Sequence, residues 1–350
     1  MQIFEKHRFL LLQCPYHLSL QEEDPPVALE SAQYVRMNVQ HCGICGTDLA
    51  FYRGRKGASY PRTLGHEYWG ILVAVGDQVP DWKIGDRAAV DLNYRCGVCF
   101  YCLSGASHLC EAGGVNLFSG RGFADSVDLH YSYLRSIPQF EPSWLGSLIE
   151  PLSCALHALE LAQVRRNDDI LLLGCGGLGS MICIAFHRLF PGLRLDVYDP
   201  NLRRSANLEA VFSAQVSALR RPPASPRYSL IFEASGKVTG FEFAARAICK
   251  AGRIVVLSRY SEREPACLPE DLARMECSIT FSHLNGDGAA FLQAADLLAS
   301  VPRHFCRSLV DVQPLSNAVE VFDRLESSMF NKTILEIRPV AEGIRGCHER

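Results

Sequence analysis

The sequence lacks the features that mark several classes of protein. No apolar run approaches the roughly 20 residues that a membrane helix needs, and the apolar piece from Phe9 to Leu12 is too short for the core of a signal peptide. The formal net charge is only -3, and no cluster of basic residues interleaves with aromatic ones. We therefore predict a cytoplasmic protein that binds neither nucleic acid nor a membrane.

Low-complexity tracts and internal repeats are also missing, and apolar residues make up 48% of the chain. The length of 350 residues exceeds the size at which one hydrophobic core usually stops growing, so two domains are expected. We predict a catalytic domain over residues 1–152 and a nucleotide-binding domain over residues 153–290. We further predict that residues 291–350 return to the first domain, because Thr333 to Ile337 alternates like a strand of that domain.

Two patterns of apolar residues divide the chain. From Val27 to Gln40 and from Tyr68 to Asp91, short β-branched stretches are broken by glycine and proline, as in a β-rich domain. After Pro151, apolar runs such as Ile170 to Leu173 alternate with helical patterns, and the helix following the glycines is expected over Ser180 to Phe190. This pattern predicts an α/β protein in which a β-rich domain accompanies a doubly wound parallel sheet.

Fifteen cysteines are many for such a chain, and four of them fall close together. They have the spacing C-x2-C-x2-C-x7-C in a glycine-rich loop and comprise Cys96, Cys99, Cys102 and Cys110. Four thiolates can close a tetrahedron around Zn(II) with no open position, which is typical of a structural ion. Free thiols and an iron–sulfur cluster are the alternatives.

A second group of metal-binding residue types lies between residues 45 and 67. Cys45, His66 and Glu67 offer a thiolate, an imidazole and a carboxylate, each next to a turn. A zinc site with three protein ligands keeps one position for a water molecule or a substrate oxygen. Taken singly, His66 and Cys45 are as well explained as ordinary buried residues.

A dinucleotide site is predicted where the alternation of strands and helices begins. The pattern G-x-G-x-x-G follows an expected strand and opens an expected helix, and Asp199 lies twenty residues beyond it. The residues predicted to bind the cofactor are Gly174, Gly176, Gly177, Leu178, Gly179, Asp199 and Arg204. A carboxylate at Asp199 favours NAD, because it would repel the 2′-phosphate of NADP. Arg203 and Arg204 weaken that argument unless they lie along the adenine rim or on a solvated helix face.

Several motifs together resemble the medium-chain zinc dehydrogenases, and most of all the branch of sorbitol and threonine dehydrogenases. The motifs occur in the family's order and are His41-Cys-Gly-Ile-Cys-Gly-Thr-Asp48, Thr63-Leu-Gly-His-Glu67, the four-cysteine loop and Leu148-Ile-Glu-Pro-Leu-Ser153. The resemblance covers nearly the whole chain. It implies a GroES-like catalytic domain, a Rossmann domain, a catalytic and a structural zinc, and NAD.

The resemblance also implies roles for single residues. Cys45 and His66 would bind the catalytic zinc, and either Glu67 or Glu150 would be the third ligand. Thr47 would take the proton of the substrate hydroxyl. Where many relatives have a histidine that passes this proton on, this chain has Ala50. Our hypothesis is that the proton leaves through the nicotinamide ribose and ordered water, or through a nearby group such as His41 or Tyr52.

The resulting prediction is an NAD-dependent alcohol dehydrogenase acting on a polyol, a cyclitol or a similar hydroxylated small molecule. The alternatives are a catalytically silent sensor or scaffold that binds NAD and zinc, and a zinc-free quinone reductase. Relatives are commonly dimers or tetramers, so we predict a homodimer or homotetramer in which residues 277–282 form an edge of the nucleotide domain.

Overall fold

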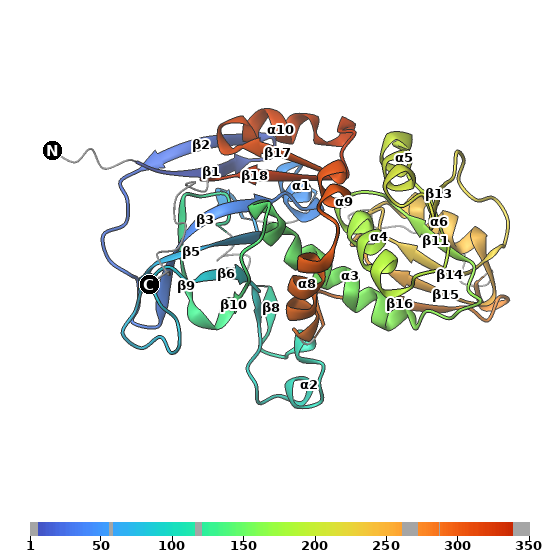
Figure 1. The fold of residues 1–350 in the computed structure, drawn as a ribbon, viewed down its shortest axis with the longest axis horizontal. Helices are drawn as coiled ribbons and strands as arrows, with labels where there is room; N and C mark the ends of the chain where they lie inside the picture. Colours follow the sequence, from blue (N-terminus) through green and yellow to red (C-terminus); the bar gives the residue numbers. More distant parts are fainter. Residues whose placement is uncertain (1–5, 56–58, 116–120, 261–271, 287, 339–350) are drawn as a thin grey trace, which may run out of the picture.

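A computed structural model describes residues 6–55, 59–115, 121–260, 272–286 and 288–338. A β-rich half, on the left in Figure 1, lies beside an α/β half on the right. This arrangement confirms the predicted fold class.

The β-rich half is built around strand β3 (Tyr34–Gly43), which pairs antiparallel with β5, β9 and β18. Val35, Met37 and Val39 alternate along β3 and are fully buried, as expected for a strand with one face on the core. Of the segment from Val27 to Gln40, in which short strands were predicted, only the part from Tyr34 onward is a strand. There Tyr34 pairs with His130 of β9 and Val35 pairs with Val75 of β5.

The main sheet of this half has the order β10-β6-β5-β3-β18-β17, and a smaller sheet has the order β2-β1-β4. The bounds are β1 His7–Cys14, β2 His17–Glu23, β4 Arg62–Thr63, β5 Glu67–Val75, β6 Arg87–Val90, β7 Asn93–Tyr94, β8 Gly114–Val115, β9 Ser126–His130, β10 Leu134–Ser136, α1 Gly46–Tyr52 and α2 Phe100–Leu103.

The α/β half contains six parallel strands in the order β13-β12-β11-β14-β15-β16. Numbered along the chain this order is 3-2-1-4-5-6, the order of a Rossmann sheet, whose ligands bind at the carboxyl ends of the strands. Every residue of β11 (Ile170–Leu173) is buried, because helices cover both faces of the sheet.

The remaining bounds in this half are α3 Ile149–Ala162, α4 Gly177–Leu189, β12 Leu195–Tyr198, α5 Leu202–Val211, β13 Val216–Ala218, β14 Tyr228–Glu233, α6 Val238–Ala247, β15 Ile248–Val256 and β16 Ser278–Phe281. Helix α4 starts three residues before the predicted Ser180, because the helix already begins inside the glycine pattern. Strand β16 lies at one edge of the sheet, where the sequence predicted an edge.

The last part of the chain returns from the α/β half to the β-rich half. Helix α8 (Ala289–Ser300) packs against α3, whereas β17 (Val310–Pro314) and β18 (Lys332–Glu336) join the sheet of β3. The strand predicted over Thr333 to Ile337 is thereby confirmed. Two further helices, α9 (Arg303–Leu309) and α10 (Ala318–Arg324), flank β17.

A network of hydrogen-bonded polar side chains connects the two halves. The buried carboxylate of Asp91, after β6, accepts hydrogen bonds from Arg95 at 2.8 Å and from Asn285 at 3.2 Å. Asn285 follows β16 of the parallel sheet. Because a buried polar group must be paired to be stable, this network fixes the junction between the halves.

In the part of the chain that the structure describes, no helix combines the length and the apolar character needed to cross a membrane.

Candidate functional site

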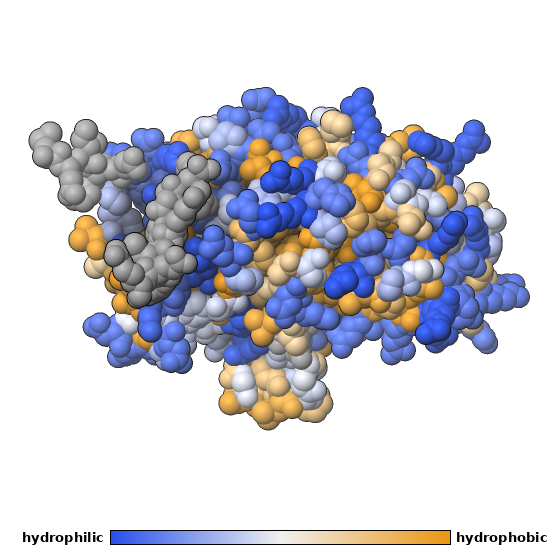
Figure 2. Space-filling model, viewed as in Figure 1, coloured by the Kyte–Doolittle hydropathy of each residue, from blue (hydrophilic) through white to orange (hydrophobic). Residues whose placement is uncertain are grey.

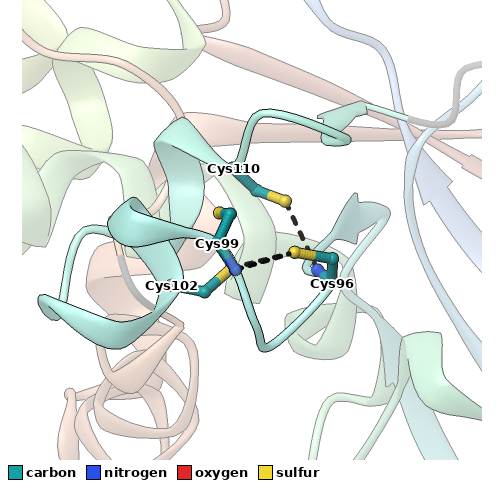
Figure 3. Close-up of side chains that lie close together, drawn as sticks. All are labelled: Cys96, Cys99, Cys102 and Cys110. Carbon is teal, nitrogen blue, oxygen red and sulfur yellow. Dashed lines mark hydrogen bonds between the residues drawn. The ribbon is translucent and has the colours of Figure 1, made fainter.

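The four predicted cysteines converge in a lobe that projects from the body of the molecule. Figure 3 shows the side chains of Cys96, Cys99, Cys102 and Cys110 facing one another. Their sulfur atoms all lie within 4.8 Å of one another, and Cys96 Sγ is 3.9 Å from Cys102 Sγ. Zn–S bonds of about 2.3 Å place the corners of a tetrahedron about 3.8 Å apart, so the donor set fits a zinc ion.

Backbone amides near Cys96 and Cys99 favour the thiolate form of these two residues. The amide of Cys99 donates to Cys96 Sγ and the amide of Cys96 donates to Cys110 Sγ, both at 3.3 Å. Amide hydrogen bonds lower the pKa of Cys99 to about 6. The lobe has little apolar core of its own, because Val98, Phe100 and Leu103 are more than 70% exposed, and Figure 2 shows the lobe as an apolar projection.

Replacing Cys110 by serine is expected to remove one bound metal ion and to loosen residues 96–110, because the lobe has too little buried apolar surface to order itself. Hydrogen exchange followed by mass spectrometry should show faster exchange in this segment, with the parallel sheet unchanged. The exposed Cys14 replaced by serine provides the control. Equal exchange in the variant and the parent would contradict a metal-dependent lobe.

A second group of metal-binding atoms forms where α1 and β5 meet. Cys45 is the N-cap of α1, His66 precedes β5, and Glu67 is the first residue of β5. One ligand atom from each lies within 4.8 Å of the other two. A thiolate, an imidazole and a carboxylate at this separation fit zinc with an open position, so the geometry supports a catalytic metal.

Asp48, one turn into α1, organises this group. Its Oδ2 accepts a hydrogen bond from the backbone amide of Cys45 at 2.9 Å, and its Oδ1 lies 3.5 Å from His66 Nδ1. Burial acts to raise the pKa of this carboxyl, but His66 and backbone amides outweigh burial and lower it. The carboxylate therefore directs Nδ1 of His66 toward itself, and Nε2 is left for a metal.

A buried lysine completes the group, and sequence reasoning missed it. Lys332 Nζ forms an ion pair with Glu67 Oε2 and donates to the carbonyl of Ile44 at 2.9 Å, and the Lys332 and Glu67 side chains are each 2% exposed. A Cβ added to Gly177 would lie 3.0 Å from Lys332 Cδ. Lys332 thus touches both the metal-binding group and the start of α4. A lysine at the start of an otherwise apolar strand was the available signal.

Glu150, the other predicted carboxylate ligand, lies near this group but outside it. Its Oε1 accepts from Cys154 Sγ at 3.7 Å. Burial raises the pKa of Glu150 to about 7, with His66 opposing the rise and Glu67 adding to it. The structure therefore brings Glu67, and not Glu150, within 4.8 Å of both Cys45 and His66.

The two side chains considered for proton exit point in different directions. His41 is 2% exposed, stacks on Trp69, and has Nε2 3.8 Å from Glu336 Oε1. The hydroxyl of Tyr52 donates to Asp323. Thr47 lies in the first turn of α1, two residues after Cys45. No contact joins Thr47 to His41 or Tyr52 within the described residues, so a relay through them stays a prediction.

His41 is expected to make stability depend on pH. Burial lowers its pKa from 6.5 to about 4, so the folded chain binds fewer protons there than the unfolded chain between these values. Stability should fall as the pH drops from 6.5 toward 4, by about 3 kcal/mol in total. Urea unfolding of the parent and of His41→Phe across this pH range measures the effect. In the variant, the free energy of unfolding should fall less steeply with decreasing pH than in the parent. Parallel slopes would exclude His41 as the cause.

The glycines of the nucleotide motif are required by close contacts. Gly174, directly after β11, has a φ of 95°, and a Cβ there would lie 2.6 Å from the amide of Ser235. A Cβ on Gly179 would lie 2.0 Å from the carbonyl oxygen of Gly174. Gly176 is the N-cap of α4, and Gly177 and Leu178 form its first turn. The backbone amides of this turn can face a pyrophosphate.

Asp199 lies at the end of β12, beside this loop. Its Oδ2 accepts from the amide of Cys175 and its Oδ1 from the amide of Asn201, both at 2.8 Å. Each carboxylate oxygen can accept a second hydrogen bond, so ribose hydroxyls can still bind. Arg204 instead donates to the carbonyls of Leu325 and Ser328, and its predicted role at the cofactor stays a prediction.

The six-stranded Rossmann sheet, its glycine loop and the two metal-competent groups define the class of zinc-type dehydrogenases that bind a nicotinamide dinucleotide. Residues 31–139 match the family model of the alcohol dehydrogenase GroES-like domain. The starvation-sensing protein RspB of Escherichia coli is 26% identical over 90% of this chain and 95% of its own. Sorbitol dehydrogenase of Halalkalibacterium halodurans is 31% identical over 47% of this chain and 48% of its own.

Among solved structures, an alcohol dehydrogenase from Escherichia coli CFT073 in complex with NADH aligns with a TM-score of 0.80 at 25% identity, over 95% of this chain and 100% of that one. The chain therefore contains an alcohol dehydrogenase GroES-like domain and is similar along most of its length to zinc-type alcohol dehydrogenases. The predicted resemblance to the medium-chain zinc-dependent family is thereby confirmed, with zinc and a nicotinamide dinucleotide as cofactors.

Proposed function

We propose that this protein oxidises a secondary hydroxyl of a polyol or cyclitol, or reduces the corresponding ketone, with NAD as the hydride carrier and one catalytic and one structural zinc. The observation that carries this proposal is Lys332, which touches Glu67 of the metal-binding group and packs at Gly177 of the dinucleotide loop. Both sites therefore belong to one active site.

In this active site, Cys45, His66 and Glu67 hold the catalytic zinc, and Asp48 orients the imidazole and the loop of Cys45. Glu150 stays nearby as a second carboxylate. Bound zinc supplies Lewis acidity toward the substrate oxygen, and bound NAD accepts hydride. Thr47 hydrogen-bonds the substrate hydroxyl and takes its proton. The balance is one secondary alcohol and NAD giving one ketone, NADH and a proton.

The remaining parts of the proposal concern the cofactor and the assembly. Asp199 favours NAD because its carboxylate would repel a 2′-phosphate. The exposed edge strand β16, where Phe281 is 64% exposed, suits pairing with a second copy, so we propose a homodimer or homotetramer located in the cytoplasm. The sensor alternative has one supporting feature, Ala50 in place of a relay histidine.

The zinc-loaded chain is expected to form NADH from at least one member of a panel of polyols and cyclitols, with kcat/KM at least ten times higher for NAD than for NADP. Replacing Asp199 by glycine should reduce this preference, because it removes the carboxylate that accepts from the ribose. Absence of turnover across the panel, with two zinc ions and NAD bound, would instead favour the sensor. A preference of the parent for NADP would overturn the cofactor assignment.

A further inference from the structure

Arg62 lies beside the active site without a carboxylate partner. In strand β4 it pairs with Leu12 of β1, which is fully buried, so the Arg62 side chain lies on the inner side of this sheet. Its Cζ is 3.6 Å from the centre of the Phe51 ring. The guanidinium thus covers the side of α1 that carries Phe51.

The charge of Arg62 is poorly compensated by the protein. Within the described ranges it has no ion pair, and its Nε is buried with no hydrogen-bond partner. Burial accordingly lowers its pKa, and the charges of Tyr60 and Asp48 oppose this shift. The contact with Phe51 compensates part of this cost, and Arg62 is only partly buried, so its guanidinium stays open to a further partner. An anion at Arg62 would supply the missing partner.

Helix α1 relates the position of Arg62 to that of Thr47. Phe51 follows Thr47 by four residues, so the two side chains lie on the same face of α1, separated by about 6 Å along the helix axis. The guanidinium over Phe51 therefore lies on the side of α1 that also carries Thr47.

We propose that Arg62 binds an anionic group, a phosphate or a carboxylate, at the end of the substrate remote from the oxidised carbon. The planar guanidinium can donate two parallel hydrogen bonds to either group. The inference rests on the proposed dehydrogenase function and narrows it to a polyol phosphate or a sugar acid. Arg62 is thereby a specificity-determining residue and takes no part in hydride transfer.

The test compares three substrates with one carbon skeleton in the zinc-loaded chain: the polyol, its terminal phosphate and its terminal carboxylate. We expect one anionic substrate to have the highest kcat/KM. Arg62→Gln should lower the ratio of anionic to uncharged kcat/KM by roughly 10- to 100-fold, mainly through KM, because a hydrogen-bonded ion pair is lost. Arg62→Lys should keep part of the ratio. The better anionic substrate shows whether a phosphate or a carboxylate is recognised.

Because the ratio is measured within one preparation, partial unfolding of a variant does not affect it. The exposed Arg55, replaced by glutamine, removes a cation near the end of α1 and should leave the ratio unchanged. Inorganic phosphate should compete with the uncharged polyol in the parent and less well in Arg62→Gln. If the parent turns over the uncharged polyol best and Arg62→Gln does not change the ratio, the anion site is refuted and the dehydrogenase function stands. If none of the three substrates reacts, both the anion site and the dehydrogenase function are refuted.

Discussion

Replacing Cys45 by alanine is expected to lower kcat/KM by about a thousandfold. Cys45 is the N-cap of α1 and contributes the thiolate of the metal-binding group, so the variant keeps only an imidazole and a carboxylate. Lewis acidity supplies several kcal/mol to an alcohol oxidation, and 1.4 kcal/mol corresponds to a factor of ten. Steady-state rates together with zinc content per chain measure the effect.

Cys42→Ala is the matched control for this loss. Cys42 lies three residues before Cys45, is fully buried, and is outside the metal-binding group. This variant should keep two zinc ions and an activity within a few fold of the parent. A large loss in Cys42→Ala together with retained activity in Cys45→Ala would reverse the assignment of the two thiols.

Replacing Lys332 by methionine is expected to lower the free energy of unfolding by about 3–5 kcal/mol, because it leaves Glu67 as a buried carboxylate without its cation. The ion pair is as deeply buried as the surrounding core, with both side chains 2% exposed. Chemical unfolding in the presence of a chelator measures this loss without a contribution from metal binding.

A double-mutant cycle separates this ion pair from general packing. Glu67→Leu combined with Lys332→Met removes both charges, and the double variant should lose less stability than the sum of the two single variants. Arg324→Met, which removes an exposed pair with Glu320, should change stability by less than 1 kcal/mol. Additive losses in the cycle would show that the two buried charges do not interact.

Local patterns were enough to predict the parts of the site that depend on short spacing. The four cysteines fall within fifteen residues, so any compact loop brings their thiols together. The glycine pattern is equally local, because Gly174 and Gly179 contact each other across one turn at the start of α4. Asp199 was predictable because a parallel sheet places the end of the next strand beside that turn.

The tertiary structure decided what depends on distant segments. Lys332 lies 265 positions from Glu67, and no periodicity links them until β18 inserts beside β3. The choice between Glu67 and Glu150 was also open in the sequence, because both lie near the metal-binding group and only coordinates separate them. Likewise, Arg62 became notable only when the fold placed it over Phe51 without a carboxylate.

The sequence by itself therefore determined the fold class, the family, the cysteine lobe and the nucleotide loop. Each of these follows from residues close together in the chain or from strand and helix periodicity. The tertiary structure alone decided how the metal-binding group meets the nucleotide loop and which charges surround it. The physical reason is that a buried charge is stable only beside a partner, and that partner can come from any segment that the fold brings within contact distance.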